Sequence, residues 1–232
     1  MGAFTPVPYF GPTRAAVRNT PEFRRVAALP RRRIEEIDLE ALIDYWTEAL
    51  KCRGGTQRLR GVQALAFEEM ATYGGAFCPI QVGGGKTLIT LLAPTVLEAQ
   101  RPVLITLANL IEKTRRELDE LQHHWRIESM RMISYELLGR EAYANKLEEY
   151  ECDALILDEA HRVKNKKAAV SRRFRRYVTN HPGVPVVALS GTMMRSKIEE
   201  FGPLLQACLR DQAPIPKDEG EAIEWGEALD LC

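Results

Sequence analysis

The sequence lacks the patterns that mark secreted, disulfide-bonded and zinc-binding proteins. Its five cysteines include no C-x-x-C pair and have no clustered histidines beside them, so neither a disulfide framework nor a zinc site is indicated. The amino-terminal segment has Pro6, Pro8 and Pro12 where a secretory signal would have a continuous apolar run. We therefore expect reduced, buried thiols in an intracellular protein.

Long apolar runs and an excess of charge of either sign are also absent. The longest apolar stretch, Leu88–Leu97, contains Pro94 and is far too short to cross a bilayer. The 32 Lys and Arg residues balance 32 Asp and Glu residues, so any contact with a polyanion must come from a local face of the protein. We expect no membrane partner and a cytoplasmic location, with the nucleus left open.

The sequence does contain an alternation of strand-like and helix-like segments. Apolar runs predict strands buried on both faces, and the amphipathic segments between them predict helices. The expected strands cover residues 76–81, 102–107, 130–134, 153–157 and 184–189. The expected helices cover residues 39–51, 58–73, 86–100, 109–124, 136–149, 165–180 and 196–210. This alternation predicts an α/β fold with a mostly parallel central sheet and helices on both faces.

Three parts of the chain differ in composition. Residues 1–57 combine an arm rich in proline and arginine with a helical extension, and residues 58–211 hold the alternation of strands and helices. Residues 212–232 contain two prolines and an acidic run, which is typical of a tail or the start of a linker. We therefore expect one principal domain with an extension on each side.

The segment Cys78–Thr87 has the composition of a phosphate-binding loop. An apolar strand leads into Gly83-Gly84-Gly85, and Lys86 and Thr87 open the next helix. Glycines let backbone N–H groups approach phosphate oxygens, and the positive end of the helix dipole faces the anion. Lys86 would contact the β and γ phosphates, and the Thr87 hydroxyl would join the shell of a Mg²⁺ ion. A flexible glycine turn is the alternative, because the usual motif has glycine where this chain has Ile80.

Two later strands also end in polar residues. One apolar strand is followed by Asp158 and Glu159, and then by His161. Beside a magnesium nucleotide, Asp158 would hold the metal, and Glu159 would orient and deprotonate the attacking water. Another apolar strand is followed by Ser190 and Thr192, whose hydroxyls would sense the γ-phosphate site through His161. The alternatives are a polar loop cap for the acidic pair and a helix N-cap for the hydroxyls.

Together these segments resemble the first RecA-like domain of a superfamily 2 helicase or translocase of the DEAH type. The strings Asp158–Asn165 (DEAHRVKN) and Leu189–Thr192 (LSGT) are most similar to the Snf2-like branch. In that family the phosphate loop begins with alanine, which accounts for the missing glycine at Ile80. The resemblance implies a RecA-like P-loop NTPase domain that uses ATP and Mg²⁺. It also implies that Gln63, in the segment Leu59–Gln63, contacts the adenine.

The resemblance further implies a nucleic-acid partner, with DNA favoured over RNA. Asn109 and Lys113 lie in or next to the segment that resembles one nucleic-acid motif, and Ser134 and Tyr135 lie in a second. These four residues are the implied contacts. The cationic helix predicted over 165–180 could add a DNA-binding strip, but a solvated charged face is the favoured interpretation.

Enzymes of this kind close ATP between two RecA-like domains. The second domain supplies arginine fingers, which are worth about 10³- to 10⁵-fold in rate in related NTPases. No second alternation of strands and helices follows residue 211. We therefore expect the chain to bind Mg·ATP and to hydrolyse it efficiently only when a second RecA-like domain or chain completes the site. A non-catalytic nucleic-acid-binding or regulatory module is the alternative. The sequence departs from the family at Leu107 and Met193, where proline is usual.

Overall fold

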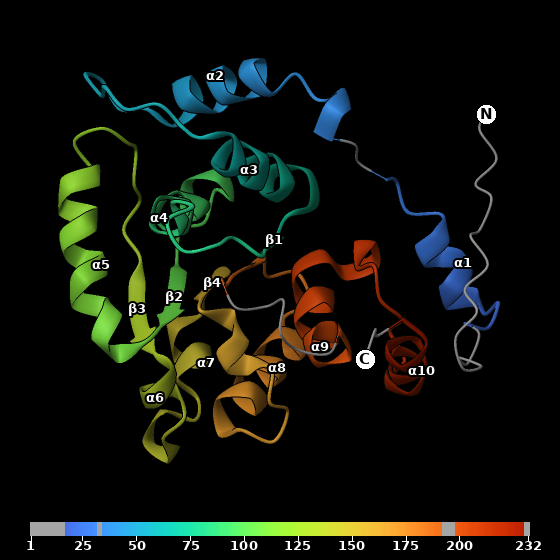
Figure 1. The fold of residues 1–232 in the computed structure, drawn as a ribbon. Helices are drawn as coiled ribbons and strands as arrows, with labels where there is room; N and C mark the ends of the chain where they lie inside the picture. Colours follow the sequence, from blue (N-terminus) through green and yellow to red (C-terminus); the bar gives the residue numbers. More distant parts are fainter. Residues whose placement is uncertain (1–16, 32–33, 192–197, 230–232) are drawn as a thin grey trace.

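Five short apolar segments of the chain lie side by side as one parallel sheet (Figure 1). The computed structural model describes residues 17–31, 34–191 and 198–229. The strands are β1 (Ala76–Cys78), β2 (Pro102–Thr106), β3 (Arg131–Ser134), β4 (Ala154–Asp158) and β5 (Val186–Leu189). Their order in the sheet is β1-β5-β4-β2-β3, and every neighbouring pair is parallel. The predicted α/β fold with a parallel sheet is confirmed.

Helices cover both faces of this sheet (Figure 1). On one face lie α2 (Leu39–Leu50), α3 (Gly61–Tyr73), α4 (Lys86–Val96) and α5 (Ala108–Leu121). On the other face lie α6 (Tyr135–Leu138), α7 (Lys146–Tyr150), α8 (Ala169–Asn180), α9 (Ile198–Leu209) and α10 (Glu219–Leu229). Short 3₁₀ turns occur at η1 (Ile34–Glu36), η2 (Glu141–Tyr143), η3 (Ala160–Val163) and η5 (Arg210–Gln212). In the described ranges, no helix has the length and apolar character needed to cross a bilayer.

The central strands are apolar throughout because each alternate side chain enters a different core. In β4, Leu155 and Leu157 pack with Phe174 of α8, whereas Ile156 packs on the opposite face with Phe67 of α3. All five of these side chains are at most 2% exposed. Full burial of such a side chain contributes about 1.5–3 kcal/mol, so the two cores fix the register of the sheet.

Most predicted elements are present, but the boundaries of two near the site differ. The predicted strand over 76–81 ends at Cys78, because Ile80 N donates to Cys78 O and turns the chain. The predicted helix over 58–73 begins at Gly61, because Arg60 is its N-cap. Both changes lengthen the loops that surround the glycine segment.

The predicted helix over 136–149 is wrong. The chain instead forms α6, η2 and α7, with Gly139 directly after α6. Glycine is a weak helix former. The buried guanidinium of Arg173, on α8, donates to the carbonyl oxygens of Leu138 and Arg140. This side chain therefore takes the place of the helical hydrogen bonds that the break removes.

The two outer segments of the chain contact one another. Helix α1 (Pro21–Ala27) lies beside α10 (Figure 1). Arg25 donates to the carbonyl oxygens of Asp211, Ala213 and Ile215 at 2.6, 3.0 and 2.7 Å, and the rings of Phe23 and Trp225 meet edge to face at 6.0 Å. We call these contacts between α1 and residues 211–225 the terminal clasp. The division of the chain at residues 57 and 211 stays a prediction.

Candidate functional site

The carboxyl ends of the strands bring the polar residues of the sequence to one edge of the sheet. Ligands of open parallel sheets bind at this edge. The glycine segment follows β1, Ser190 follows β5, Asp158 ends β4, and Thr106 ends β2. Because β1, β5, β4 and β2 are consecutive in the sheet, these groups form a row.

The glycine segment has a backbone that only glycine fits well. Gly83 and Gly85 have φ angles of +84° and +79°, in the left-handed region that side chains disfavour. A Cβ on Gly84 would lie 2.4 Å from Ile80 Cγ2, and one on Gly85 would lie 2.3 Å from Gln63 Nε2. The loop therefore keeps its backbone bare at the start of α4, as an anion cradle requires.

Lys86 lies across this loop toward the end of β5. Its Nζ donates to Ile80 O at 3.2 Å. A Cβ on Gly191 would be 3.4 Å from the same Nζ, so the residue after Ser190 packs against the lysine. The positive charge of Lys86 partly opposes the rise in the pKa of the Asp158 carboxyl that burial causes.

Gln63 is tied to the glycine segment. It is only 4% exposed, its Oε1 accepts from Arg60 N at 2.8 Å, and its Nε2 donates to Gly85 O at 3.2 Å. Arg60 Nη1 donates to Gly83 O at 2.8 Å. Sequence reasoning gave Arg60 no role, although it lies in the same Leu59–Gln63 segment. Gln63 and Arg60 together hold the loop against α3.

A cavity of about 490 Å³ opens beside these residues. It is lined by Arg60, Gln63, Gly85 and Thr87, and on its far side by Glu117 of α5. The hollow lies where the glycine segment ends and α4 begins. An adenine contact by Gln63 stays a prediction.

Asp158 ends β4, and Glu159 follows it in a strained turn. Burial raises the pKa of Asp158, and the adjacent Glu159 raises it further, while the Thr106 hydroxyl and Lys86 oppose the shift. Glu159 has a φ of +54°, a conformation that costs a non-glycine residue about 1–2 kcal/mol. Such strain is concentrated at functional sites.

His161 and Ser190 meet as the sequence suggested. The distance from His161 Nδ1 to Ser190 Oγ is 3.1 Å, and that to Glu159 Oε2 is 3.3 Å. Burial lowers the pKa of His161, although Glu159 opposes the shift, so the imidazole is neutral at pH 7. Thr192 lies outside the described residues. The coupling role of these groups stays a prediction.

Comparison with known proteins identifies the family. A model of the SNF2-related domain matches residues 95–213, just over half of the chain. The chain belongs to this family. The match includes Asp158, Glu159, His161 and Ser190, and it begins after the glycine segment. SNF2-related domains are ATPases of the helicase and translocase type, which use nucleotide and Mg²⁺ and engage nucleic acid. No curated protein matches the chain.

The SNF2-related chain offers oxygen ligands that suit Mg²⁺. They are the Thr87 hydroxyl at the start of α4 and the Asp158 carboxylate at the end of β4. Mg²⁺ is usually held by one or two carboxylates together with substrate phosphates, and it keeps several waters. Within the described ranges, no group of three or more His, Cys, Asp and Glu side chains could hold a metal alone. The donor set therefore fits a metal that arrives with a nucleotide.

Two of the four residues predicted to contact nucleic acid in the SNF2-related chain are buried in this structure. Ser134 and Tyr135 are 1% and 4% exposed. Ser134 Oγ accepts from Leu137 N at 3.1 Å as the N-cap of α6, and Tyr135 OH donates to Asp158 O at 2.7 Å. The sequence motif does not reveal that α6 turns both side chains inward. Asn109 and Lys113 lie exposed on α5, so their contacts stay predictions.

The cations of α8 are largely occupied in contacts within the SNF2-related chain. Arg173 pairs with Glu141 at 2.9 Å and Arg176 pairs with Glu148 at 2.7 Å, while Arg172 donates to Lys167 O. These contacts favour a structural, solvated face over a DNA-binding strip.

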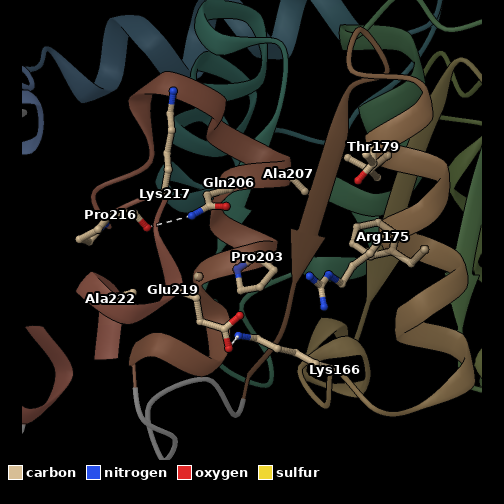
Figure 2. A pocket seen from close by; sticks show the side chains of 13 residues that line it. Lys166, Arg175, Thr179, Pro203, Gln206, Ala207, Pro216, Lys217, Glu219 and Ala222 are labelled. Atoms are coloured by element: carbon tan, nitrogen blue, oxygen red, sulfur yellow. Dashed lines mark hydrogen bonds and ion pairs between the residues drawn. The ribbon is translucent and has the colours of Figure 1, made fainter. Parts of the chain in front are cut away.

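A second hollow of about 280 Å³ lies between α8, α9 and residues 216–222 (Figure 2). Lys166 Nζ lies 2.5 Å from Glu219 Oε1, and Gln206 Nε2 donates to Pro216 O at 2.9 Å. The Arg175 guanidinium points toward the middle of this hollow (Figure 2). None of the predicted nucleotide-site residues lines it.

Proposed function

We propose that this chain is the N-terminal ATPase half of an ATP-dependent DNA translocase or helicase, with residues 58–211 as its ATP-binding domain. The observation that carries the proposal is the meeting of separate segments at the carboxyl ends of neighbouring strands. Lys86, at the end of the bare glycine loop, packs against Gly191 just after β5, and Asp158 ends β4, where it pairs with Leu189 of β5. Glycine loop, lysine and acidic residue are the parts that recur in P-loop NTPases.

Each of these residues would have a distinct task. Lys86 would bind the β and γ phosphates, with the backbone of Gly83-Gly84-Gly85 around them. Thr87 and Asp158 would hold Mg²⁺, which neutralises charge on the transferring phosphoryl group when it is bound. Glu159 would orient the attacking water and accept its proton.

The link to neighbouring strands would run through His161 and Ser190. Their contact at 3.1 Å joins the turn after β4 to the end of β5, so a change at the γ-phosphate position would be felt at both. A neutral imidazole suits this role because it can donate one hydrogen bond and accept another.

Efficient turnover would require a second RecA-like domain or chain that supplies arginine fingers. Without one, we expect nucleotide binding with slow hydrolysis. DNA contacts from the exposed residues of α5 would be made mainly to phosphates, so binding would weaken strongly with salt.

Titration of a fluorescent ATP analogue with Mg²⁺ tests the proposal. Lys86→Ala should weaken binding by at least tenfold, because it removes a charge-assisted contact with the phosphates. Lys167→Ala, on the exposed segment before α8, is the control and should leave binding unchanged. Equal binding by wild type and Lys86→Ala would overturn the proposal.

A second assay tests whether double-stranded DNA is the nucleic-acid partner. Hydrolysis should rise when double-stranded DNA and a candidate second-domain chain are added together. DNA binding that ATP does not affect, with no turnover under any of these conditions, would instead identify a non-catalytic DNA-binding module.

A further inference from the structure

Two buried hydroxyls donate hydrogen bonds to Asp158, one from the end of β2 and one from the start of α6. We propose that Thr106 and Tyr135 are positioning residues that fix Asp158 for the metal ion, so that they control the magnesium-dependent step and leave nucleotide binding itself unaffected. This inference rests on the proposed function of Asp158 as the metal-holding carboxylate. We call the two side chains the hydroxyl clamp.

The hydroxyl clamp contacts both the side chain and the main chain of Asp158. Thr106 Oγ1 donates to the carboxylate at Oδ2, at 3.2 Å, and Tyr135 OH donates to the backbone carbonyl oxygen at 2.7 Å. One contact sets the side-chain rotamer, and the other sets the peptide plane from which Glu159 departs. Asp158 is therefore fixed on two sides just before the strained turn.

One donor lies on a strand and the other begins the helix that follows the next strand, so the arrangement depends on the sheet. Thr106 ends β2, which pairs directly with β4, and Tyr135 follows β3, which pairs with β2. Their side chains are 0% and 4% exposed. A buried hydroxyl without a partner is costly, so each hydroxyl holds to Asp158 instead of exchanging with water.

Loss of the Thr106 hydroxyl would free the Asp158 carboxylate to rotate, because its hydrogen bond to Oδ2 restrains the side chain. A carboxylate that is no longer held in one orientation is a poorer ligand for Mg²⁺, which demands near-ideal octahedral geometry.

The hydroxyl clamp is joined to α5 as well. Glu136, next to Tyr135, accepts from Ala108 N at 3.2 Å, at the first turn of α5. The exposed Asn109 and Lys113 lie on the same helix. Two adjacent residues therefore link the start of α5 to Asp158. Glu136 contacts Ala108 of α5, and Tyr135 contacts the main chain of Asp158.

The test uses Tyr135→Phe and Thr106→Val in the full chain. Both variants remove one hydroxyl and keep the volume of the side chain. Nucleotide affinity measured in EDTA should be unchanged. The affinity for Mn²⁺ in the presence of nucleotide, measured by electron paramagnetic resonance, should fall by roughly tenfold or more, which is typical when a group that orients a metal ligand is lost. Thr106→Ser, which retains the hydroxyl, should restore it.

Tyr177→Phe is the matched control. Tyr177 is also buried, and its OH donates to Cys152 O at 2.7 Å, before the opposite end of β4. It should lower the urea midpoint to the same degree as Tyr135→Phe and leave Mn²⁺ affinity unchanged. With a second-domain chain present, Tyr135→Phe should lower kcat and leave KM unchanged.

Hydrogen exchange of the free protein separates this inference from the proposed function. Amides of residues 158–163 should exchange faster in Tyr135→Phe than in wild type, and those of α10 should not change. If residues 158–163 exchange faster in Tyr135→Phe but the wild type binds no nucleotide, the proposed function is wrong. The hydroxyl clamp would then still restrain Asp158 in the folded protein. If exchange and Mn²⁺ affinity both stay at wild-type values in the two variants, the clamp is wrong.

Discussion

Asp158 carries its carboxylate in a place that disfavours negative charge. Burial is the main cause of its raised pKa, and the neighbouring Glu159 is the second. When a carboxyl has a higher pKa in the folded than in the unfolded state, the protein loses stability as the pH rises through the folded-state pKa. The metal-free protein should therefore become more stable when this charge is removed.

We predict that Asp158→Asn raises the urea midpoint at pH 7.5 in EDTA. The gain should shrink as the pH is lowered through the folded-state pKa toward the usual value of 3.8, because the wild-type carboxyl is then neutral too. Asp119→Asn, on the exposed face of α5, serves as the control. A lower midpoint for Asp158→Asn at pH 7.5, or a gain that does not vary with pH, would contradict the prediction. The same variant should lose magnesium-dependent hydrolysis.

The parts of the candidate site that consist of consecutive residues were predictable from the sequence. Lys86 and Thr87 follow three glycines, and Asp158 and Glu159 follow an apolar strand, so local pattern and strand polarity were enough. The hydroxyl clamp was not predictable in this way. Thr106 looks like any strand residue, and Tyr135 lay in a motif that suggested an exposed contact. Only the packing of β3 and α6 decides that its hydroxyl points at Asp158.

At the scale of elements, the terminal clasp joins segments that are far apart in the sequence. The Arg25 guanidinium donates to three carbonyl oxygens between residues 211 and 215 and also pairs with Glu22 at 3.0 Å. The planar guanidinium carries five N–H donors in a fixed fork, and an ammonium cannot reproduce this geometry.

We predict that Arg25→Lys lowers the free energy of unfolding by about 1–3 kcal/mol, since the carbonyls of the buried residues Ala213 and Ile215 lose charge-assisted partners. Urea unfolding followed by circular dichroism measures the change. Arg24→Lys, at the exposed neighbouring position, should change the midpoint little. Equal midpoints for the two variants would mean that the clasp does not stabilise the fold.

The elements that were predicted best are those whose ends carry a local signal. Asp38 accepts from Ala41 N at 3.0 Å as the N-cap of α2, as its position before an apolar stripe indicated. The break between α6 and α7 has no comparable signal, because the residue that compensates for it, Arg173, comes 34 positions after Gly139. Local sequence periodicity does not reveal contacts between residues that are this far apart in the chain.

At the scale of the whole molecule, binding of Mg·ATP to the sheet edge should stabilise the fold. A ligand that binds only the native state adds about 2.7 kcal/mol at a concentration one hundred times its Kd. For a protein of this size, that corresponds to a rise in Tm of roughly 5–10 °C. Differential scanning fluorimetry with and without Mg·ATP measures it. Lys86→Ala should show little rise, and an equal rise for both proteins would contradict the assigned site.

The position of β1 in the sheet has a consequence for biosynthesis. β1 carries the glycine loop, lies at the edge of the five-stranded sheet, and pairs with β5, whose register joins Ala76 to Val187. During translation, more than 100 residues must leave the ribosome before this strand meets its neighbour. Such long-range parallel pairing is slow. A nascent chain would therefore complete its proposed nucleotide site only after β5 emerges.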